Sequence, residues 1–288
     1  MKHKLLLIFC CLATLGGIVV TACKPRPVSD KPSVFVTIEP LRFFAEQIAG
    51  NHFDIQTMVP TGSSPETYDP TPQQLMDLTE CKAFLTIGQL GFEKQWIPKL
   101  AENAPNVTFK NTSEGITYLE SSHHHEGEEH GKDPHTWTSP SCALVICKNI
   151  CNLFCEIDPE HQDEYTQNYT RLVTLIQQTD AEVRKVANDE MQKTFAIYHP
   201  TLTYFANDYQ LKQLCIEDEG KEPSPAQLKS LILQCKQNDV KVIFVQKEFN
   251  THNAEIIAKE IGAKIVTINP LSYNWQEEII HIANSLKK

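Results

Sequence analysis

Short apolar runs alternate with longer stretches of helical periodicity along most of the chain. The first apolar run, residues 34–38, is followed by residues 40–50, in which apolar positions recur every three or four residues. This succession predicts a strand and then a helix, and its repetition predicts parallel βαβ units and an α/β fold. Further strands are predicted at residues 53–59, 83–88, 107–109, 194–198, 213–216, 242–245 and 264–268. Further helices are predicted at residues 72–79, 96–101, 143–157, 160–191, 202–209, 224–237, 251–261 and 274–286.

One helical stretch is much longer than the others. It opens at Asp158-Pro159-Glu160, and neither glycine nor proline interrupts the residues that follow as far as His199. A single helix of this length would link two lobes rigidly. We therefore predict two α/β lobes with parallel sheets, formed by residues 33–158 and 192–288 and joined by a linker helix of residues 159–191.

The N-terminal segment has the pattern of an export signal. Residues 1–4 are basic, residues 5–20 are apolar, and Val20-Thr21-Ala22-Cys23 matches the lipobox of bacterial lipoproteins, whose cysteine becomes the acylated N-terminus. The apolar stretch is also just long enough to be a retained membrane anchor. Either interpretation puts the rest of the chain on the non-cytoplasmic side. We expect residues 1–22 to be a signal peptide, Cys23 to carry a lipid anchor in the membrane, and residues 23–32 to be a tether.

Composition and charge narrow the class of protein. The chain has 288 residues, of which 41% are hydrophobic and 22% charged, so it has the composition of a globular protein large enough for two domains. Its formal net charge is −10. Such a surface repels phosphate backbones, which argues against nucleic acid as a partner.

Seven cysteines remain outside the N-terminal segment: Cys81, Cys142, Cys147, Cys151, Cys155, Cys215 and Cys235. An odd number cannot all pair within the chain. Cys147, Cys151 and Cys155 recur every four residues on an apolar helical face. We interpret them as small buried hydrophobic residues rather than as a thiolate metal site. A disulfide across one helical turn would have poor geometry.

Three polar side chains that follow predicted strand ends are candidates for binding a ligand. His199 lies at the C-terminal end of the strand at residues 194–198, and Glu66 also follows a strand. His135 lies between Pro134 and Trp137, which would hold its imidazole rigidly and limit access of water. In open α/β sheets the carboxyl ends of strands line the ligand crevice. These positions together predict a metal or small-ligand site.

A polar segment at residues 121–132 interrupts the alternation and must be a solvated loop. It contains His123, His124, His125 and His130, interleaved with three glutamates. We interpret it as an auxiliary, low-affinity collector of metal ions, and the alternative is a loop that merely tolerates charge. Ordering a flexible loop around a metal costs backbone entropy, so its affinity should be modest.

Several stretches of the chain carry a resemblance to a known family. They are residues 62–72, Asp133-Pro134-His135-Thr136-Trp137, Tyr198-His199-Pro200 with Tyr204-Phe205, Glu222-Pro223-Ser224, Ile243-Phe244-Val245 and Asn269-Pro270-Leu271. Together they resemble the cluster A-I substrate-binding lipoproteins of ABC importers for zinc and manganese, solute-binding protein family 9. The resemblance covers nearly the whole chain after the signal, and the His-rich loop resembles that of the zinc members.

The resemblance implies a fold of two α/β lobes joined by a long helix, with the metal held between the lobes. Carried over to this chain, it puts the ligands at Glu66, His135, His199 and Asn269. Most members have His where this chain has Glu66, and many have Asp where it has Asn269. Two imidazoles and one carboxylate suit Zn²⁺ and also permit Mn²⁺ or Fe²⁺. Because an amide oxygen is a weak ligand, water is the alternative in the fourth position.

The function implied by the resemblance is that of an extracytoplasmic, lipid-anchored, monomeric protein. It would capture a transition-metal ion, zinc first, and deliver it to an ABC permease, with no enzymatic activity. One alternative is a metal-dependent hydrolase, since two His and one Glu resemble a catalytic zinc site. The chain contains no HExxH motif, and only Asp133 could act as a general base beside the ligands. A surface adhesin or structural lipoprotein is the other alternative.

Overall fold

The computed structural model describes residues 31–120, 131–189, 191–217 and 220–288. Residues 31–288 form one compact unit. The predicted signal peptide, Cys23 and the loop histidines His123, His124, His125 and His130 lie outside the described residues.

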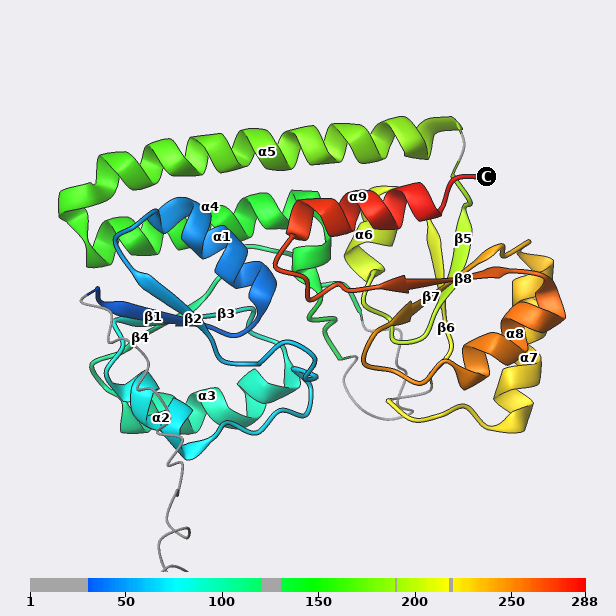
Figure 1. The fold of residues 1–288 in the computed structure, drawn as a ribbon, viewed down its shortest axis with the longest axis horizontal. Helices are drawn as coiled ribbons and strands as arrows, with labels where there is room; N and C mark the ends of the chain where they lie inside the picture. Colours follow the sequence, from blue (N-terminus) through cyan, green and yellow to red (C-terminus); the bar gives the residue numbers. More distant parts are fainter. Residues whose placement is uncertain (1–30, 121–130, 190, 218–219) are drawn as a thin grey trace, which may run out of the picture. The chain divides into compact units, whose positions relative to one another are not determined.

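Two four-stranded sheets, all parallel, form the framework of residues 31–288 (Figure 1). The first has the order β2-β1-β3-β4 and the second the order β6-β5-β7-β8, so the two lobes repeat one topology. The strands are β1 Ser33–Val36, β2 Asp54–Thr57, β3 Ala83–Thr86, β4 Thr108–Asn111, β5 Thr194–Ile197, β6 Lys212–Cys215, β7 Val242–Gln246 and β8 Lys264–Ile268. The predicted fold class of two α/β lobes with parallel sheets is confirmed.

Helices cover the sheets and connect the strands, as parallel pairing requires. They are α1 Glu39–Ala49, α2 Pro72–Thr79, α3 Gly91–Asn103, α4 Pro140–Ile157, α5 Gln162–Asp189, α6 Thr203–Asp208, α7 Pro225–Gln237, α8 His252–Ile261 and α9 Trp275–Ser285, with short 3-10 helices η1 Thr136–Thr138 and η2 Pro159–His161. Local sequence explains several of these boundaries. Thr71 and Ser224 cap α2 and α7 with capping boxes, and each of these helices has proline in its first turn.

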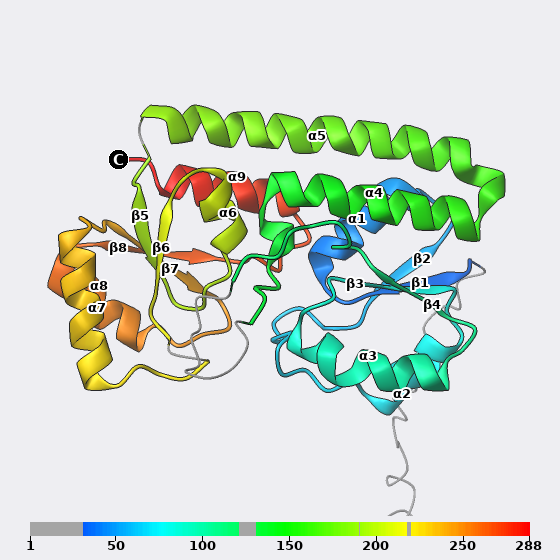
Figure 2. The same ribbon diagram turned by 180° about the vertical axis from the view of Figure 1, so that it is seen from behind.

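The long helix α5 runs along both lobes, as the two opposite views show (Figures 1 and 2). Its 28 residues span about 42 Å at the α-helical rise. It packs on α1 and α4 of the N-terminal lobe and on α9 of the C-terminal lobe. Residues 159–161, predicted as part of this helix, form the separate turn η2, because the backbone of Asp158 is non-helical and Pro159 begins a new turn.

The largest hydrophobic cluster is continuous across the two lobes. It joins Phe44 and Trp137 of the N-terminal lobe to Phe195, Phe205 and Trp275 of the C-terminal lobe, all of them buried. The indole of Trp137 donates to the Pro270 carbonyl oxygen at 2.8 Å, which adds a polar tie between the lobes. Because close-packed interiors deform little, this shared core restrains wide opening of the lobes.

Helix α4 is the one helix among the described residues that is long and apolar enough to cross a membrane. It packs on α1 and α5, and its Cys147, Ile150 and Phe154 are fully buried in the shared cluster. It is therefore a core helix. Cys147 and Cys151 are buried hydrophobic residues as predicted, whereas Cys155 is half-buried.

Candidate metal centre

A cavity of about 30 Å³ lies between the two lobes. The loops that follow β2, β5, β7 and β8 contribute to its wall, together with the segment around η1. Its lining residues are Ser64, Pro65, Glu66, His135, Trp137, His199, Thr201, Gln246, Glu248, Phe249, Pro270 and Leu271. The structure thus brings Glu66, His135 and His199 to one cavity, at the carboxyl ends of parallel strands where ligands of α/β proteins bind.

His135 is 5% exposed and is held by the carboxylate of Asp133. Asp133 Oδ1 accepts from the His135 backbone N–H at 2.8 Å and lies 2.9 Å from the ring nitrogen Nδ1. Asp133 Oδ2 in turn accepts from the Thr203 hydroxyl at 2.7 Å, and the Tyr204 hydroxyl donates to the Asp133 carbonyl oxygen at 2.8 Å. Since Thr203 and Tyr204 belong to α6, the C-terminal lobe fixes a loop of the N-terminal lobe.

The ionisation of this pair follows from its surroundings. Burial lowers the pKa of His135, but the charge and hydrogen bond of Asp133, with smaller effects of Glu66 and Glu217, raise it above its ordinary value. Burial raises the pKa of Asp133, and contacts with His135 and Thr203 outweigh this and bring it below its ordinary value. Both directions have one cause, the contact between the Asp133 carboxylate and the His135 ring, which favours the charged form of each.

His199 follows β5 and is fixed from several sides. Its Nδ1 lies 2.6 Å from Oε1 of Glu217, which follows β6 and is 6% exposed. The Gln246 side-chain amide donates to the His199 carbonyl oxygen at 2.6 Å. Phe249 stacks on the imidazole with ring centroids 5.4 Å apart. Each of the two cavity histidines is therefore oriented by a carboxylate at Nδ1, the arrangement that in metal sites leaves Nε2 to coordinate.

Glu66 presents a buried carboxylate oxygen. Its Oε2 accepts from the Gly91 N–H at 2.9 Å, while Oε1 has no hydrogen-bond partner in the part of the chain that the structure describes. A buried, unsatisfied oxygen costs about 1–3 kcal/mol. A Cβ on residue 91 would lie 2.3 Å from the Glu66 carbonyl oxygen, so only glycine permits this approach. The orphaned oxygen is the feature that a bound cation would satisfy.

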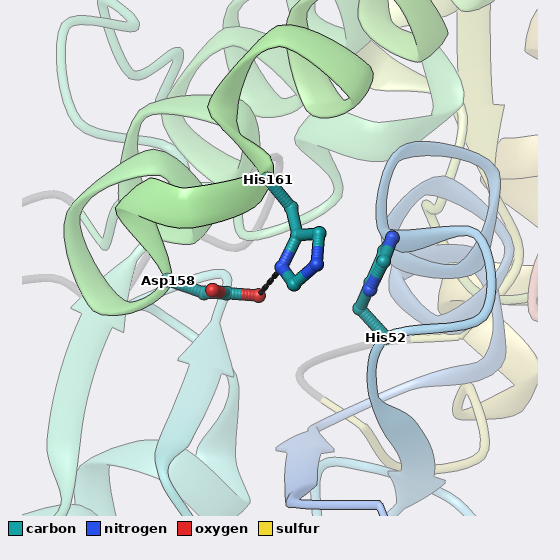
Figure 3. A group of neighbouring side chains, drawn as sticks. All are labelled: His52, Asp158 and His161. Carbon is teal, nitrogen blue, oxygen red and sulfur yellow. Dashed lines mark hydrogen bonds and ion pairs between the residues drawn. The ribbon is translucent and has the colours of Figure 1, made fainter.

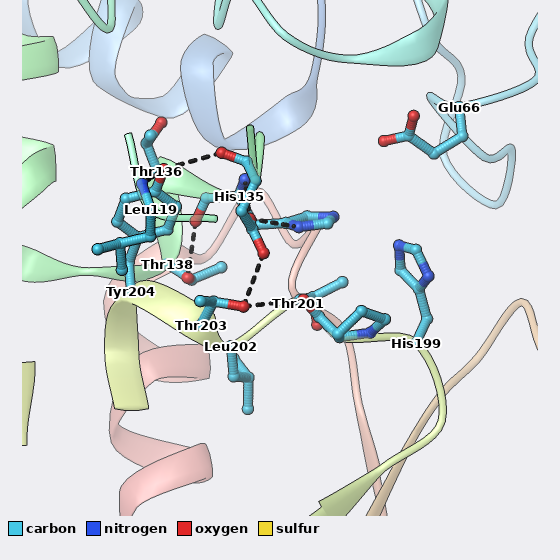
Figure 4. Close-up of polar contacts among 12 residues, drawn as sticks. Glu66, Leu119, His135, Thr136, Thr138, His199, Thr201, Leu202, Thr203 and Tyr204 are labelled. Atoms are coloured by element: carbon cyan, nitrogen blue, oxygen red, sulfur yellow. Dashed lines mark hydrogen bonds and ion pairs between the residues drawn. The ribbon is translucent and has the colours of Figure 1, made fainter. Parts of the chain in front are cut away.

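Figure 4 shows the carboxylate of Glu66 and the rings of His135 and His199 directed toward one space. The two imidazole centroids are 5.2 Å apart. Among the described residues, one group of three side chains has its ligand atoms all within 4.8 Å of one another, and that group lies outside the cavity. The ligand atoms of Glu66, His135 and His199 are therefore more widely spaced. Coordination at about 2.0–2.2 Å would therefore require small side-chain rotations.

Asn269, the remaining predicted ligand, does not line this cavity. Its backbone N–H donates to Glu278 of α9 at 2.7 Å, and the residue borders a neighbouring hollow formed with α1 and residues 59–63. The following Pro270 and Leu271 line the cavity instead. The carboxylate-bearing Glu248, after β7, also lines the cavity.

Sequence reasoning missed Gly91, Glu217, Gln246 and Glu248. Glu217 and Glu248 follow strands β6 and β7, and Gln246 ends β7. The rule of strand ends that selected His199 would also have selected these three. Gly91 gives no such signal, because its role depends on where the loop with Glu66 packs.

The fold and cavity define a class: a two-lobed α/β binding protein with its ligand site between the lobes. Residues 34–288 match the ZnuA family, described as zinc-uptake complex component A, periplasmic. The chain belongs to this family of solute-binding transport proteins. The predicted resemblance and transport class are confirmed.

Individual relatives agree with this assignment. The high-affinity zinc uptake system protein ZnuA of Bacillus subtilis is 30% identical over 261 residues, which cover 86% of this chain and 81% of that protein. The zinc-binding lipoprotein AdcA of Streptococcus pneumoniae is 26% identical over 93% of this chain, which spans only 56% of AdcA. A crystal structure of a ZnuA deletion mutant with zinc bound has a TM-score of 0.82 and 34% identity, covering 90% of this chain and 99% of that chain.

Proposed function

We propose that this protein captures one transition-metal ion, Zn²⁺ before Mn²⁺ or Fe²⁺, in the cavity between its lobes and delivers it to an ABC permease. Glu66, His135 and His199 are the proposed ligands. The observation that carries the proposal is the buried Oε1 of Glu66, which has no hydrogen-bond partner in the described chain and faces two imidazoles oriented by carboxylates. An ion at this point would satisfy the oxygen and use the nitrogen Nε2 of each ring.

The donor set favours zinc. Two imidazoles and one carboxylate are typical zinc ligands and permit Mn²⁺ or Fe²⁺. One carboxylate ligand leaves the bound ion with a formal charge of +1, and the buried carboxylates of Asp133 and Glu217 lie directly behind the imidazoles. We assign the fourth position to Glu248 or water rather than to Asn269, because Glu248 lines the cavity. Relatives named as zinc uptake and zinc-binding proteins support the same choice of ion.

Capture requires local adjustment rather than wide hinge motion. Helix α5 packs on both lobes, and the hydrophobic core continues between them. Rotation of the Glu66 side chain and of the segment after β7 is the smaller movement that closes the site. The permease would then recognise the protein by the position of these loops at the mouth of the cavity.

The location and organisation of the protein extend this proposal. We propose that Cys23 carries a lipid anchor on the outer side of the membrane after removal of residues 1–22, with residues 23–32 as a tether. Residues 33–158 and 192–288 would be the two lobes of a monomer, linked by residues 159–191. The four histidines of residues 121–130 would collect metal at low affinity.

Replacing Glu66→Gln tests the ligand set. The variant keeps the size of the side chain but removes its charge, so we expect zinc affinity to fall at least tenfold in a competition titration against a chelator. Gly91→Ala should also weaken binding, because its Cβ displaces the loop that carries Glu66. The matched control is Glu102→Gln on the exposed surface of α3. Unchanged affinity in a folded Glu66→Gln protein would remove this residue from the site.

A further inference from the structure

A second group of metal-ligand side chains lies outside the cavity. One ligand atom each of His52, Asp158 and His161 lies within 4.8 Å of the others (Figure 3). His52 belongs to the turn between α1 and β2, while Asp158 and His161 belong to the junction of α4 and α5. None of the three lines the interlobe cavity. This group, the junction cluster, lies at the end of the N-terminal lobe that is remote from the C-terminal lobe (Figures 1 and 2).

The two imidazoles of this group lie close enough to share an ion. The rings of His52 and His161 are 3.9 Å apart between centroids, with planes inclined by 30°. Because the nitrogen lone pairs lie in the ring planes, those of stacked rings do not meet at one point, and binding requires one imidazole to turn about its side-chain torsions. One nitrogen of each ring then reaches the distance of about 2.0–2.1 Å that zinc requires.

Carboxylates surround these rings. Asp158 Oδ2 lies 2.8 Å from Nδ1 of His161 and accepts from the Tyr165 hydroxyl at 2.5 Å. Glu164, in the first turn of α5, lies 2.9 Å from Nε2 of His52 through its Oε2. Burial raises the pKa of Asp158, but the hydrogen bonds from Tyr165 and His161 outweigh it and bring the pKa below its ordinary value. A carboxylate is ionised at neutral pH already at its ordinary pKa, so Asp158 offers an anionic ligand.

We propose that His52, Asp158 and His161 form a second site for a divalent transition-metal ion, Zn²⁺ first, with Glu164 as the fourth ligand. Two imidazoles and two carboxylates make a neutral complex with a divalent ion, and the nitrogen ligands select zinc over Ca²⁺ or Mg²⁺. The side chains of His52, Asp158 and His161 are 23%, 23% and 41% exposed, so ions can reach them from solvent. A bound ion would tie the turn before β2 to the start of α5.

This site should bind more weakly than the interlobe cavity. In the structure the histidines and carboxylates bond to one another, and an ion must replace those contacts and displace the imidazole protons. Partial exposure also lowers the electrostatic gain. Zinc binding at this site should raise the unfolding temperature, because only the folded chain brings the turn before β2 to the junction of α4 and α5.

The test uses a background protein without the other proposed sites: the full chain with His135→Ala, His199→Ala and residues 121–130 replaced by a Gly-Ser linker. Titration with ZnSO₄ by calorimetry should show one equivalent bound, and zinc should raise the unfolding temperature. Both effects should disappear on adding His52→Ala and His161→Ala. The matched control adds His252→Ala and His281→Ala, two exposed histidines, and should keep both effects.

A milder variant guards against loss of folding. In His161→Gln the new side chain can still form hydrogen bonds but is a weak zinc ligand. The variant should therefore bind zinc at least tenfold more weakly, while its free energy of unfolding without zinc stays unchanged. Anomalous diffraction at the zinc edge should place the ion between His52 and His161. The proposal would be overturned if the background protein bound no zinc ion. It would also be overturned if zinc still bound after His52→Ala and His161→Ala were added. Failure of the interlobe proposal gives a different result. The background protein would then still bind one zinc ion tightly, and substitutions of His52 and His161 would not remove that ion.

Discussion

The interlobe cavity and the junction cluster contain similar side chains in different arrangements. Each has two imidazoles with carboxylates beside them. In the cavity, the carboxylates that hold the imidazoles are buried behind them, and Glu66 faces them with an oxygen that has no partner in the described chain. In the junction cluster, the carboxylates that hold the imidazoles are the same ones that would coordinate the ion.

This difference shows that short distances between ligand atoms do not by themselves measure the strength of a site. The junction cluster is closely spaced because its members bond to one another, and those bonds are lost on binding. The cavity is more widely spaced, yet its imidazoles already have fixed orientations and its orphaned oxygen has no bond to give up. Preorganisation lowers the cost of binding. We therefore expect the cavity to bind zinc more tightly.

The largest effect should come from His199→Ala. This change removes one imidazole from the cavity and leaves the junction cluster intact. Loss of a residue that only hydrogen-bonds to a metal ligand costs about 10–100-fold in affinity, so loss of a ligand itself should lower zinc affinity in the cavity by about 100-fold or more. A competition titration with a chromophoric chelator measures it, with His281→Ala as the control. Equal loss of affinity in both variants would contradict the comparison.

Asp133→Asn should have an intermediate effect on the cavity. The amide can keep the contact with Nδ1 of His135 but not the charge, so affinity near pH 8 should fall about tenfold. Zinc binds the unprotonated imidazole, and the pKa of His135 is raised by Asp133. In the unmodified protein, affinity should therefore fall as the pH drops to this raised pKa.

In Asp133→Asn the pKa of His135 is lower, so the fall in affinity should begin at a lower pH. Titrations at several pH values between about 5.5 and 8 locate its onset. Thr203→Val, which removes only the hydroxyl that bonds to Asp133, serves as the control and should leave the charge and most of the pH profile in place. An onset that does not move in Asp133→Asn would show that this charge does not set the proton competition.

The smallest effect should come from Asp158→Asn in the absence of metal. The pKa of Asp158 is lowered in the folded protein, so its ionised form adds stability at pH values above the unfolded pKa, and this stability is lost as the pH falls through the folded pKa. Because solvent screens this group, the loss at pH 7 should be about 0.5–1 kcal/mol in the free energy of urea unfolding. The difference between the two proteins should shrink near pH 3 and grow when zinc is added. If zinc does not change the difference in unfolding free energy between the two proteins, the junction cluster is held by hydrogen bonds alone and binds no ion.

Much of the fold could be predicted because its signals are local. Helix α2 and strand β8 begin and end at the predicted residues, since proline, capping residues and apolar runs mark their ends within a few positions. The linker helix was predicted to begin at residue 159 but begins at Gln162, because the turn η2 intervenes. Local patterns do not distinguish a 3-10 turn from the first turn of an α-helix.

For the cavity, the sequence determined which residue types stand at the strand ends, and thereby the choice of Glu66, His135 and His199 as proposed ligands. The tertiary structure decided what surrounds them. It placed Asp133 and Glu217 behind the imidazoles, left room at Gly91 for Glu66, and turned the loop of Asn269 toward α9. Periodicity reports which face of an element is buried, but not which loops of two lobes meet.

The junction cluster marks that limit most clearly. His52, Asp158 and His161 stand in no recognisable motif, and a single histidine in a turn gives no reason to expect a partner. They come together because α1, α4 and α5 pack on one another and bring the turn before β2 against the α4–α5 junction. The sequence by itself determined most of the elements, the family and the choice of Glu66, His135 and His199 in the cavity. Only packing between elements distant along the chain decided which side chains share a site, because convergence in space depends on contacts that no local pattern encodes.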